Sequence, residues 1–177
     1  MGVGATMGSA IGSAVALFCS NSCPGDIILR AQDWANARGP DSAPVIGGFH
    51  TPVERDALRI LLRGNAPVII VLARAAQGWR APKPLGPAIK AAVAAGTAQI
   101  VSPFPATQTR TTATAAEARN RHILTLCDTV LIAHAAPGSK TEALAQEAKA
   151  MGLPIFTLPS PANSHLLQMG AQIVPDQ

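Results

Sequence analysis

Aromatic side chains are scarce in this 177-residue sequence: Phe, Trp and Tyr make up 3% of it, and Tyr does not occur at all. A nucleic-acid-binding platform built on rows of stacked aromatic residues is therefore poorly supplied. Only 14% of the residues are charged, with a formal net charge of +4. That balance permits a polyanionic partner without requiring one.

Cysteine is also rare. Cys19, Cys23 and Cys127 are too few, and odd in number, for the disulfide framework of a secreted domain. The four histidines show no paired spacing that would complete a zinc site, so we expect no bound metal. The first 20 residues lack the basic segment of a signal peptide, and their apolar part is shorter than a spanning helix. We therefore expect a cytoplasmic protein that does not bind a membrane.

Hydrophobic residues, in contrast, make up 48% of the chain and occur in short runs that alternate with helical patterns. The expected strands cover residues 14–19, 44–48, 67–73, 98–104, 129–135, 154–159 and 171–174, and the expected helices cover 24–39, 51–64, 87–96, 112–127, 140–152 and 164–170.

Strands that alternate with helices need crossover connections, which produce parallel pairs. The pattern therefore predicts the α/β class: a doubly wound, mainly parallel sheet of five to seven strands with helices on both faces. No linker or repeat interrupts it, so we expect one domain over residues 1–177. Ligands of such sheets bind at the carboxyl ends of the strands, near the topological switch point.

The segment APGSKTEA (136–143) follows the fifth expected strand and is suited to an anion. Gly138 can turn the chain, and Ser139, Lys140 and Thr141 begin a helix whose free N–H groups and dipole favour negative charge. A structural interpretation fits equally well, because Ser139 and Glu142 form an S-x-x-E capping box. Both interpretations can hold together.

Arginines supply further candidates. Arg119 and Arg121 stand two apart on a helix, so they point in different directions, and helix-surface charge is the commoner role for such residues. Arg55, Arg59 and Arg63 recur every four residues as a basic stripe, which is usually a solvated face but could line a polyanion.

Ser20 and Ser22 lie between the first strand and the first helix, where dinucleotide-binding folds carry a glycine loop. The G-x-G-x-x-G pattern is absent. Glu54 and Glu142 are the acids that stand close behind strand ends.

Residues 115–175 resemble the DNA-processing protein A family, which carries R-N-R-x-I, a Ser/Gly-Thr helix start, G-x-P-V/I-F and N-x-x-L-I-x-x-G-A. The residues that match these motifs are Arg119, Asn120, Arg121 and Ile123; Gly138, Ser139 and Thr141; Gly152, Pro154, Ile155 and Phe156; and Asn163, Leu166, Leu167, Gly170 and Ala171. The first half is similar more loosely: PVIGGFHTPVERDAL stands where the family has S-G-x-A-x-G-I-D, with Gly48 retained but the Arg and the I-D pair replaced.

The resemblance implies a Rossmann-like domain that binds single-stranded DNA or a nucleotide, assists a RecA-type recombinase in natural transformation and DNA recombination, and forms homodimers. Small and apolar residues along 87–96 and 142–152 could serve such a dimer. We do not expect the flanking helical and winged-helix domains of many members, nor a cofactor beyond a nucleotide or phosphate ligand. The phosphate- or nucleic-acid-binding residues that we predict are Ser20, Ser22, Gly48, Arg119, Arg121, Gly138, Ser139, Lys140 and Thr141.

The same superfamily contains cytokinin-activating phosphoribohydrolases. The alternative hypothesis is therefore a nucleotide or phosphoribosyl hydrolase with Glu54 or Glu142 as its carboxylate. Against it, Leu144 stands where the motif P-G-G-x-G-T-x-x-E has its catalytic Glu. We expect a binding module rather than an enzyme.

Overall fold

The computed structural model describes residues 13–175. Most of the 20-residue N-terminal stretch considered above, residues 1–12, therefore lies outside the described residues. Seven strands form one sheet in the order β4-β3-β2-β1-β5-β6-β7, and every neighbouring pair is parallel. The strands are β1 (Val15–Cys19), β2 (Val45–Gly47), β3 (Val68–Val71), β4 (Ala98–Val101), β5 (Thr129–His134), β6 (Ile155–Thr157) and β7 (Gln172–Ile173).

Six α-helices and one short 3₁₀-helix connect the strands. They are α1 (Gly25–Asn36), α2 (Pro52–Arg63), α3 (Gly86–Ala95), α4 (Ala113–Leu124), α5 (Lys140–Ala150), η1 (Pro161–Asn163) and α6 (Ser164–Gln168). The doubly wound parallel fold predicted from the sequence is confirmed, with the ends of several elements shifted by a few residues.

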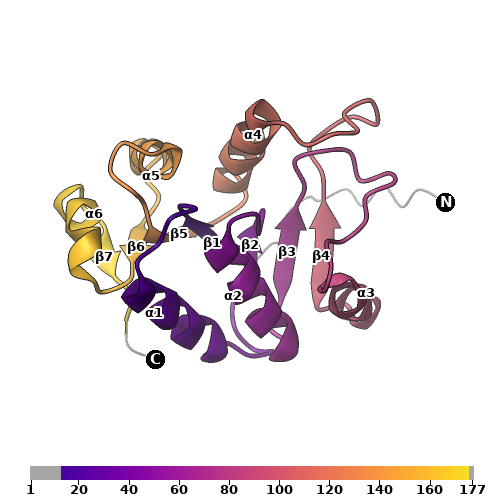
Figure 1. Ribbon diagram of the computed structural model, residues 1–177, viewed down its shortest axis with the longest axis horizontal. Coiled ribbons are helices and arrows are strands. Elements are labelled where there is room, and N and C mark those ends of the chain that lie inside the picture. The colour runs from indigo at the N-terminus through magenta and orange to yellow at the C-terminus, as the bar shows by residue number, and fades with distance from the viewer. Residues whose placement is uncertain (1–12, 176–177) are drawn as a thin grey trace.

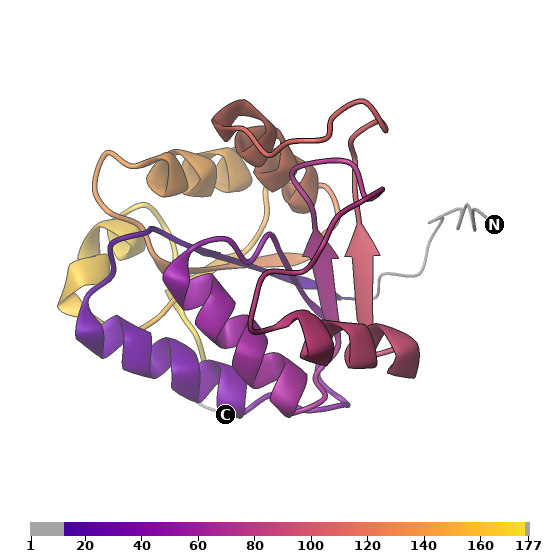
Figure 2. The same ribbon diagram turned by 45° about the vertical axis from the view of Figure 1, so that its right-hand side comes forward.

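Helices cover both faces of the sheet (Figure 1). In the turned view, α1, α2 and α3 lie on one side, and α4 and α5 lie on the other (Figure 2). Each face has its own hydrophobic core, with Leu17, Leu61 and Leu131 in the first and Ile46, Ile123 and Ile132 in the second. Central strands such as β3 are buried along their whole length, which explains their unbroken apolar sequence.

Local sequence sets where the helices begin and end. At α2, the Thr51 hydroxyl accepts a hydrogen bond from the Glu54 amide, and Pro52 occupies the first turn, where no amide donor is needed. Gly64 ends the same helix. Because α2 runs back against the strands, its start lies at the carboxyl edge of the sheet and Arg63 lies at the opposite edge.

The topological switch point lies between β1 and β5. β1 pairs with β2 on one side and with β5 on the other, because the chain returns from the edge strand β4 through α4 to the centre of the sheet. The segments that follow β1 and β5 therefore meet at the carboxyl edge. Across residues 13–175, no helix is both long and apolar enough to cross a membrane.

Candidate functional site

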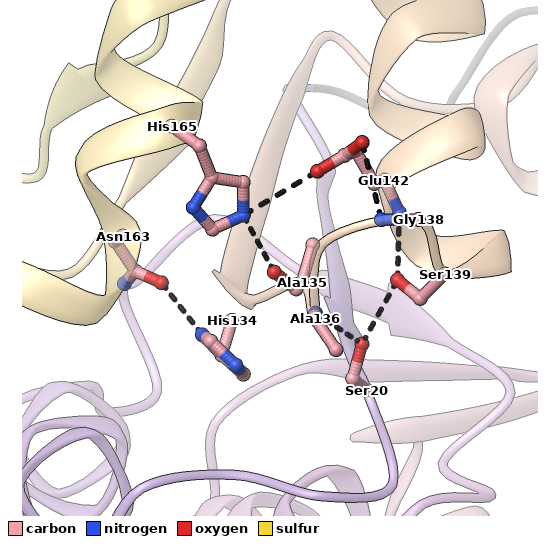
Figure 3. Close-up of polar contacts among 9 residues, drawn as sticks. All are labelled: Ser20, His134, Ala135, Ala136, Gly138, Ser139, Glu142, Asn163 and His165. Carbon is pink, nitrogen blue, oxygen red and sulfur yellow. Dashed lines mark hydrogen bonds and ion pairs between the residues drawn. The ribbon is translucent and has the colours of Figure 1, made fainter.

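Ser20 and Ser139 meet at the switch point, as expected for residues that follow neighbouring strands (Figure 3). The Ser20 hydroxyl accepts a hydrogen bond from the Ala136 amide at 3.0 Å and lies 3.4 Å from the Ser139 hydroxyl. The Ser139 hydroxyl accepts from the Glu142 amide at 3.2 Å, which caps α5. The structure therefore brings Ser20, Gly138 and Ser139 together.

The Glu142 side chain occupies the N-terminus of α5. Its Oε1 accepts from the Gly138 amide at 3.4 Å, and its Oε2 lies 3.6 Å from His165 Nε2 (Figure 3). His165 Nε2 is also 2.6 Å from the carbonyl oxygen of Ala135, so this nitrogen carries a proton and donates it. The capping interpretation is confirmed for Ser139, whereas the Glu142 carboxylate bonds one residue earlier than a capping box requires.

A second buried pair supports the end of β5. Asn163 is fully buried, and its amide nitrogen donates to the carbonyl oxygens of Ala133 and Leu158, each at 2.9 Å. Its Oδ1 lies 2.8 Å from Nδ1 of the buried His134, which must donate. We call Ser20, His134, Ser139, Glu142, Asn163 and His165 the switch-point network.

Arg119 lies elsewhere on the same edge, against β2 and β3. Its side chain packs on Gly48 so closely that a Cβ at Gly48 would lie 2.6 Å from Nε and closer still to Cζ. Nε donates to Asn120 Oδ1 at 2.8 Å, and Nη1 makes a long contact of 3.5 Å with the carbonyl oxygen of Val71. Gly48 is therefore needed here to make room for the guanidinium.

The helix-surface interpretation is wrong for Arg119, whose exposed fraction is 6%. Ala115, Arg119 and Ile123 are spaced four apart and all are buried, so Arg119 belongs to the stripe of α4 that faces the sheet. Burial lowers the pKa of Arg119, and the negative charge of Glu54 partly opposes this. Within residues 13–175 the guanidinium forms no ion pair, and Nη2 has no hydrogen-bond partner.

A pocket of about 190 Å³ opens beside this guanidinium. Arg119, His50 and Arg55 line it together with Gly48, and we call it the Arg119 pocket. Its remaining walls come from Phe49, Leu58, Ile70, Val71, Leu72, Ala73, Trp79, Pro82, Leu85, Ile89 and Thr111.

Arg121 and Lys140 lie between α4 and α5, where each contacts a glutamate. Arg121 Nε is 3.0 Å from Glu147 Oε2, and Lys140 Nζ is 2.6 Å from Glu117 Oε1. Both basic side chains are exposed, so the helix-surface interpretation holds for Arg121.

The predicted residues therefore separate into the switch point, the Arg119 pocket and this α4–α5 surface. Ser22 is exposed and Thr141 half-buried, and the ligand-binding roles remain predictions.

The basic stripe of α2 does not act as a unit. Arg59 pairs with Asp56 at 2.6 Å, and Arg63 donates to Asn36 at 2.9 Å. Arg55, one turn from the start of the helix, lines the Arg119 pocket.

The two carboxylates proposed for a hydrolase both bind backbone amides. Glu54 is buried: its Oε2 accepts from the Cys19 amide and its Oε1 from the His50 amide, each at 3.0 Å. It thereby ties the end of β1 to the start of α2. Leu144, in the place of the hydrolase glutamate, is buried in the core under α5.

Several residues at this edge were not found from the sequence. Trp79 lies in a Pro- and Gly-rich loop, where nothing in the local pattern indicates that it faces a pocket. Phe49 follows β2 and has a φ of 49°, a left-handed conformation that is rare for an aromatic residue. A phenylalanine in the sequence gives no sign of such a conformation. A signal did exist for Arg119, namely its four-residue spacing from Ala115 and Ile123.

Solved structures share this fold. DNA processing protein A from Streptococcus pneumoniae is 20% identical with a TM-score of 0.74, and the alignment covers 92% of this chain and 58% of that one. The Helicobacter pylori protein is also 20% identical with a TM-score of 0.74, covering 93% and 76%. The molybdenum cofactor carrier protein of Chlamydomonas reinhardtii is 12% identical with a TM-score of 0.60, covering 93% and 90%.

This chain thus spans little more than half the length of the S. pneumoniae protein. Among curated proteins, none matches its sequence. Residues 13–177 match the sequence profile of DNA recombination-mediator protein A, which spans nearly the whole chain. The chain belongs to the DNA recombination-mediator protein A family.

Proposed function

We propose that this chain binds single-stranded DNA through its phosphates at the carboxyl edge of the sheet, centred on the Arg119 pocket, and serves in DNA recombination. The observation that carries the proposal is a guanidinium that is nine-tenths buried, pairs with no carboxylate of residues 13–175 and lines an open pocket.

A buried cation without a direct ion pair is costly, because the more distant charge of Glu54 compensates its loss of hydration only in part. A phosphate offers the compensation, since the guanidinium presents several N–H donors in a planar fork that matches phosphate oxygens. Nη2 of Arg119 is available for such a bond. Arg55 at the same pocket would add long-range attraction for a polyanion.

Family membership supports DNA as the source of the phosphate. The Helicobacter pylori protein, which has the same fold, is described by its single-stranded DNA binding mode. A hydrolase is disfavoured, because Glu54 and Glu142 both accept hydrogen bonds from the backbone and Leu144 replaces the catalytic acid.

The proposal also covers the localisation, the oligomeric state and the protein partner of this chain. We propose a cytoplasmic homodimer that works with a RecA-type recombinase, and the recombination-mediator family supports the last part. Val93 on α3 and Met151 after α5 are exposed, with 43% and 51% of their surfaces accessible, and lie in the two segments proposed for the dimer. Sedimentation of a monomer at high micromolar concentration would remove the dimer.

The test compares two arginines of the same helix. Arg55→Ala removes a charge at the Arg119 pocket, and Arg63→Ala removes the same charge at the opposite edge of the sheet. Fluorescence anisotropy of a labelled dT oligomer should show affinity about two- to tenfold lower for Arg55→Ala, the range of one hydrogen bond. Arg63→Ala should bind as wild type does.

The salt dependence of the affinity for the dT oligomer is an independent test. The logarithm of the affinity should fall linearly with the logarithm of salt concentration, with a slope of about −0.7 per phosphate contacted. Arg55→Ala should make that slope shallower, and Arg63→Ala should not. If wild type does not bind the oligomer at low salt, or if both variants lose affinity equally, the proposal is wrong.

A further inference from the structure

The Arg119 pocket has apolar lining residues that phosphate binding does not explain. Trp79, Leu85 and Ile89 line it together with the basic residues, and Ile89 is the residue of α3 that is buried. A phosphate site alone needs no indole. The pocket therefore offers cationic side chains and an aromatic side chain to the same ligand.

The loop that carries Trp79 is held in place by hydrogen bonds. Arg74 donates from Nη2 to the Gln77 carbonyl oxygen at 2.9 Å, and the Ser102 hydroxyl donates to the Arg74 carbonyl oxygen at 2.6 Å. The Ala75 amide donates to the carbonyl oxygen of Gln108 in the loop before α4. These bonds fix the loop after β3 to the segment after β4, so the loop that carries Trp79 is largely preformed, as is usual for ligand sites.

The volume limits the ligand. About 190 Å³ is smaller than the 300–1,000 Å³ typical of pockets for drug-sized ligands, so the pocket suits one flat group of a longer molecule. An apolar slot beside an unpaired guanidinium matches a nucleotide unit, which joins a flat, stackable base to an anionic phosphate. Every base has a π-face, so stacking on one indole does not require a particular sequence.

We infer that the Arg119 pocket is a slot for a single base of bound DNA: the base stacks on Trp79, and the adjoining phosphate is bound by Arg119 Nη2. This inference rests on the proposed function and adds to it, because it fixes one nucleotide of the strand in one place. The scarcity of aromatic residues in the sequence does not exclude such base stacking, because the slot uses a single aromatic residue, Trp79.

The two tryptophans make the slot observable. Trp34 lies on α1 with the Arg38 guanidinium 4.8 Å above its ring, and Trp34→Phe leaves Trp79 as the remaining emitter. In that variant, a dT oligomer should quench the fluorescence of Trp79. An oligomer of the same length with abasic sugars keeps the phosphates but should bind about 5- to 150-fold more weakly, the range expected for loss of one stacked base, and should not quench.

Substitution of Trp79 completes the test. Trp79→Ala should lower affinity for the dT oligomer to that for the abasic oligomer, whereas Trp79→Phe, which retains a ring, should keep most of it. Thermal unfolding of both variants checks that the loop change leaves the fold intact. Thymidine monophosphate serves as the free-nucleotide probe, and we expect it to compete much more weakly than the oligomer, because it makes one phosphate contact.

The outcomes separate the two proposals. If wild type binds both oligomers equally and Trp79→Ala changes nothing, the base slot is wrong while phosphate binding stands. If neither oligomer binds, the proposed function fails and the slot with it. If thymidine monophosphate quenches Trp79 with the affinity of the oligomer, the pocket is a free-nucleotide site and the assignment to DNA is overturned.

Discussion

The switch-point network and the Arg119 pocket lie at the same edge of the sheet but differ in how far their polar groups are satisfied. In the network, Ser20, Ser139 and Glu142 all bond to nearby backbone amides. In the pocket, the Arg119 guanidinium forms no direct ion pair with any of residues 13–175. A segment whose sequence suits an anion can therefore be occupied by the protein's own carboxylate, while a single buried arginine remains available.

The largest expected effect concerns the stability of the network. Asn163→Ala should lower the free energy of unfolding by roughly 3 kcal/mol, because it removes a donor from the carbonyl oxygens of Ala133 and Leu158 and the partner of the buried His134 ring. Chemical denaturation measures this. Gln168→Ala, an exposed change on α6, should cost much less, and DNA affinity of the folded Asn163→Ala protein should stay unchanged.

Gly48→Ala should damage the pocket. The added Cβ collides with the Arg119 guanidinium, so we expect about 1–3 kcal/mol of destabilisation and at least about tenfold weaker DNA binding. Gly138→Ala is the matched control: its φ of 75° makes alanine strained by about 1–2 kcal/mol, but no atom lies within 4 Å. Equal loss of DNA affinity in both variants would contradict the distinction between the two regions.

A smaller change is expected at the α4–α5 surface. Lys140 Nζ lies 2.6 Å from Glu117 Oε1, and its hydrogen bond and charge lower the pKa of Glu117. Glu117→Gln should free Lys140 for phosphate contact and raise DNA affinity about two- to threefold, the value of a weak surface pair. Asp33→Asn on α1 makes the same change in net charge far from this surface, and an equal gain there would assign the effect to net charge alone.

The smallest effect concerns the cysteines. A hydrogen bond from Cys19 lowers the pKa of the Cys23 thiol, whereas burial raises the pKa of Cys127 to about 11. Iodoacetamide at pH 8 should therefore label Cys23 before Cys127, because the thiolate is the reactive form.

Cys23 follows β1, near the switch point, so bound DNA in the Arg119 pocket should leave its labelling rate unchanged. Mass spectrometry of the digested protein measures both rates, and strong protection of Cys23 by DNA would place the strand over the switch point.

The fold could be predicted from the sequence because its signals are local. Buried parallel strands need continuous apolar runs, and caps such as Thr51 and Gly64 mark helix ends directly. The sequence also placed Ser20 and Ser139 after strands, at the carboxyl edge of the sheet, whereas the pairing of β1 with β5 that brings them together came from the structure.

The site was less predictable because it depends on side-chain direction. Arg119 and Arg121 look alike in sequence, yet one is buried against Gly48 and the other pairs with Glu147 at the surface. The sequence also did not show which charged residues form ion pairs. Glu117 and Lys140 lie on different helices and meet only in the folded chain. Trp79 reaches the pocket through a loop whose course is set by tertiary hydrogen bonds.

Photo-crosslinking tests most directly whether DNA lies over the Arg119 pocket rather than over the switch-point network. A dT oligomer that carries 4-thiothymidine, irradiated with the wild-type chain and digested, reports the contacted peptides by mass spectrometry. The account predicts crosslinks in residues 48–55 and 79–89, which contribute to the walls of the pocket. Crosslinks concentrated in residues 136–142 and 163–168, with none around the pocket, would contradict it.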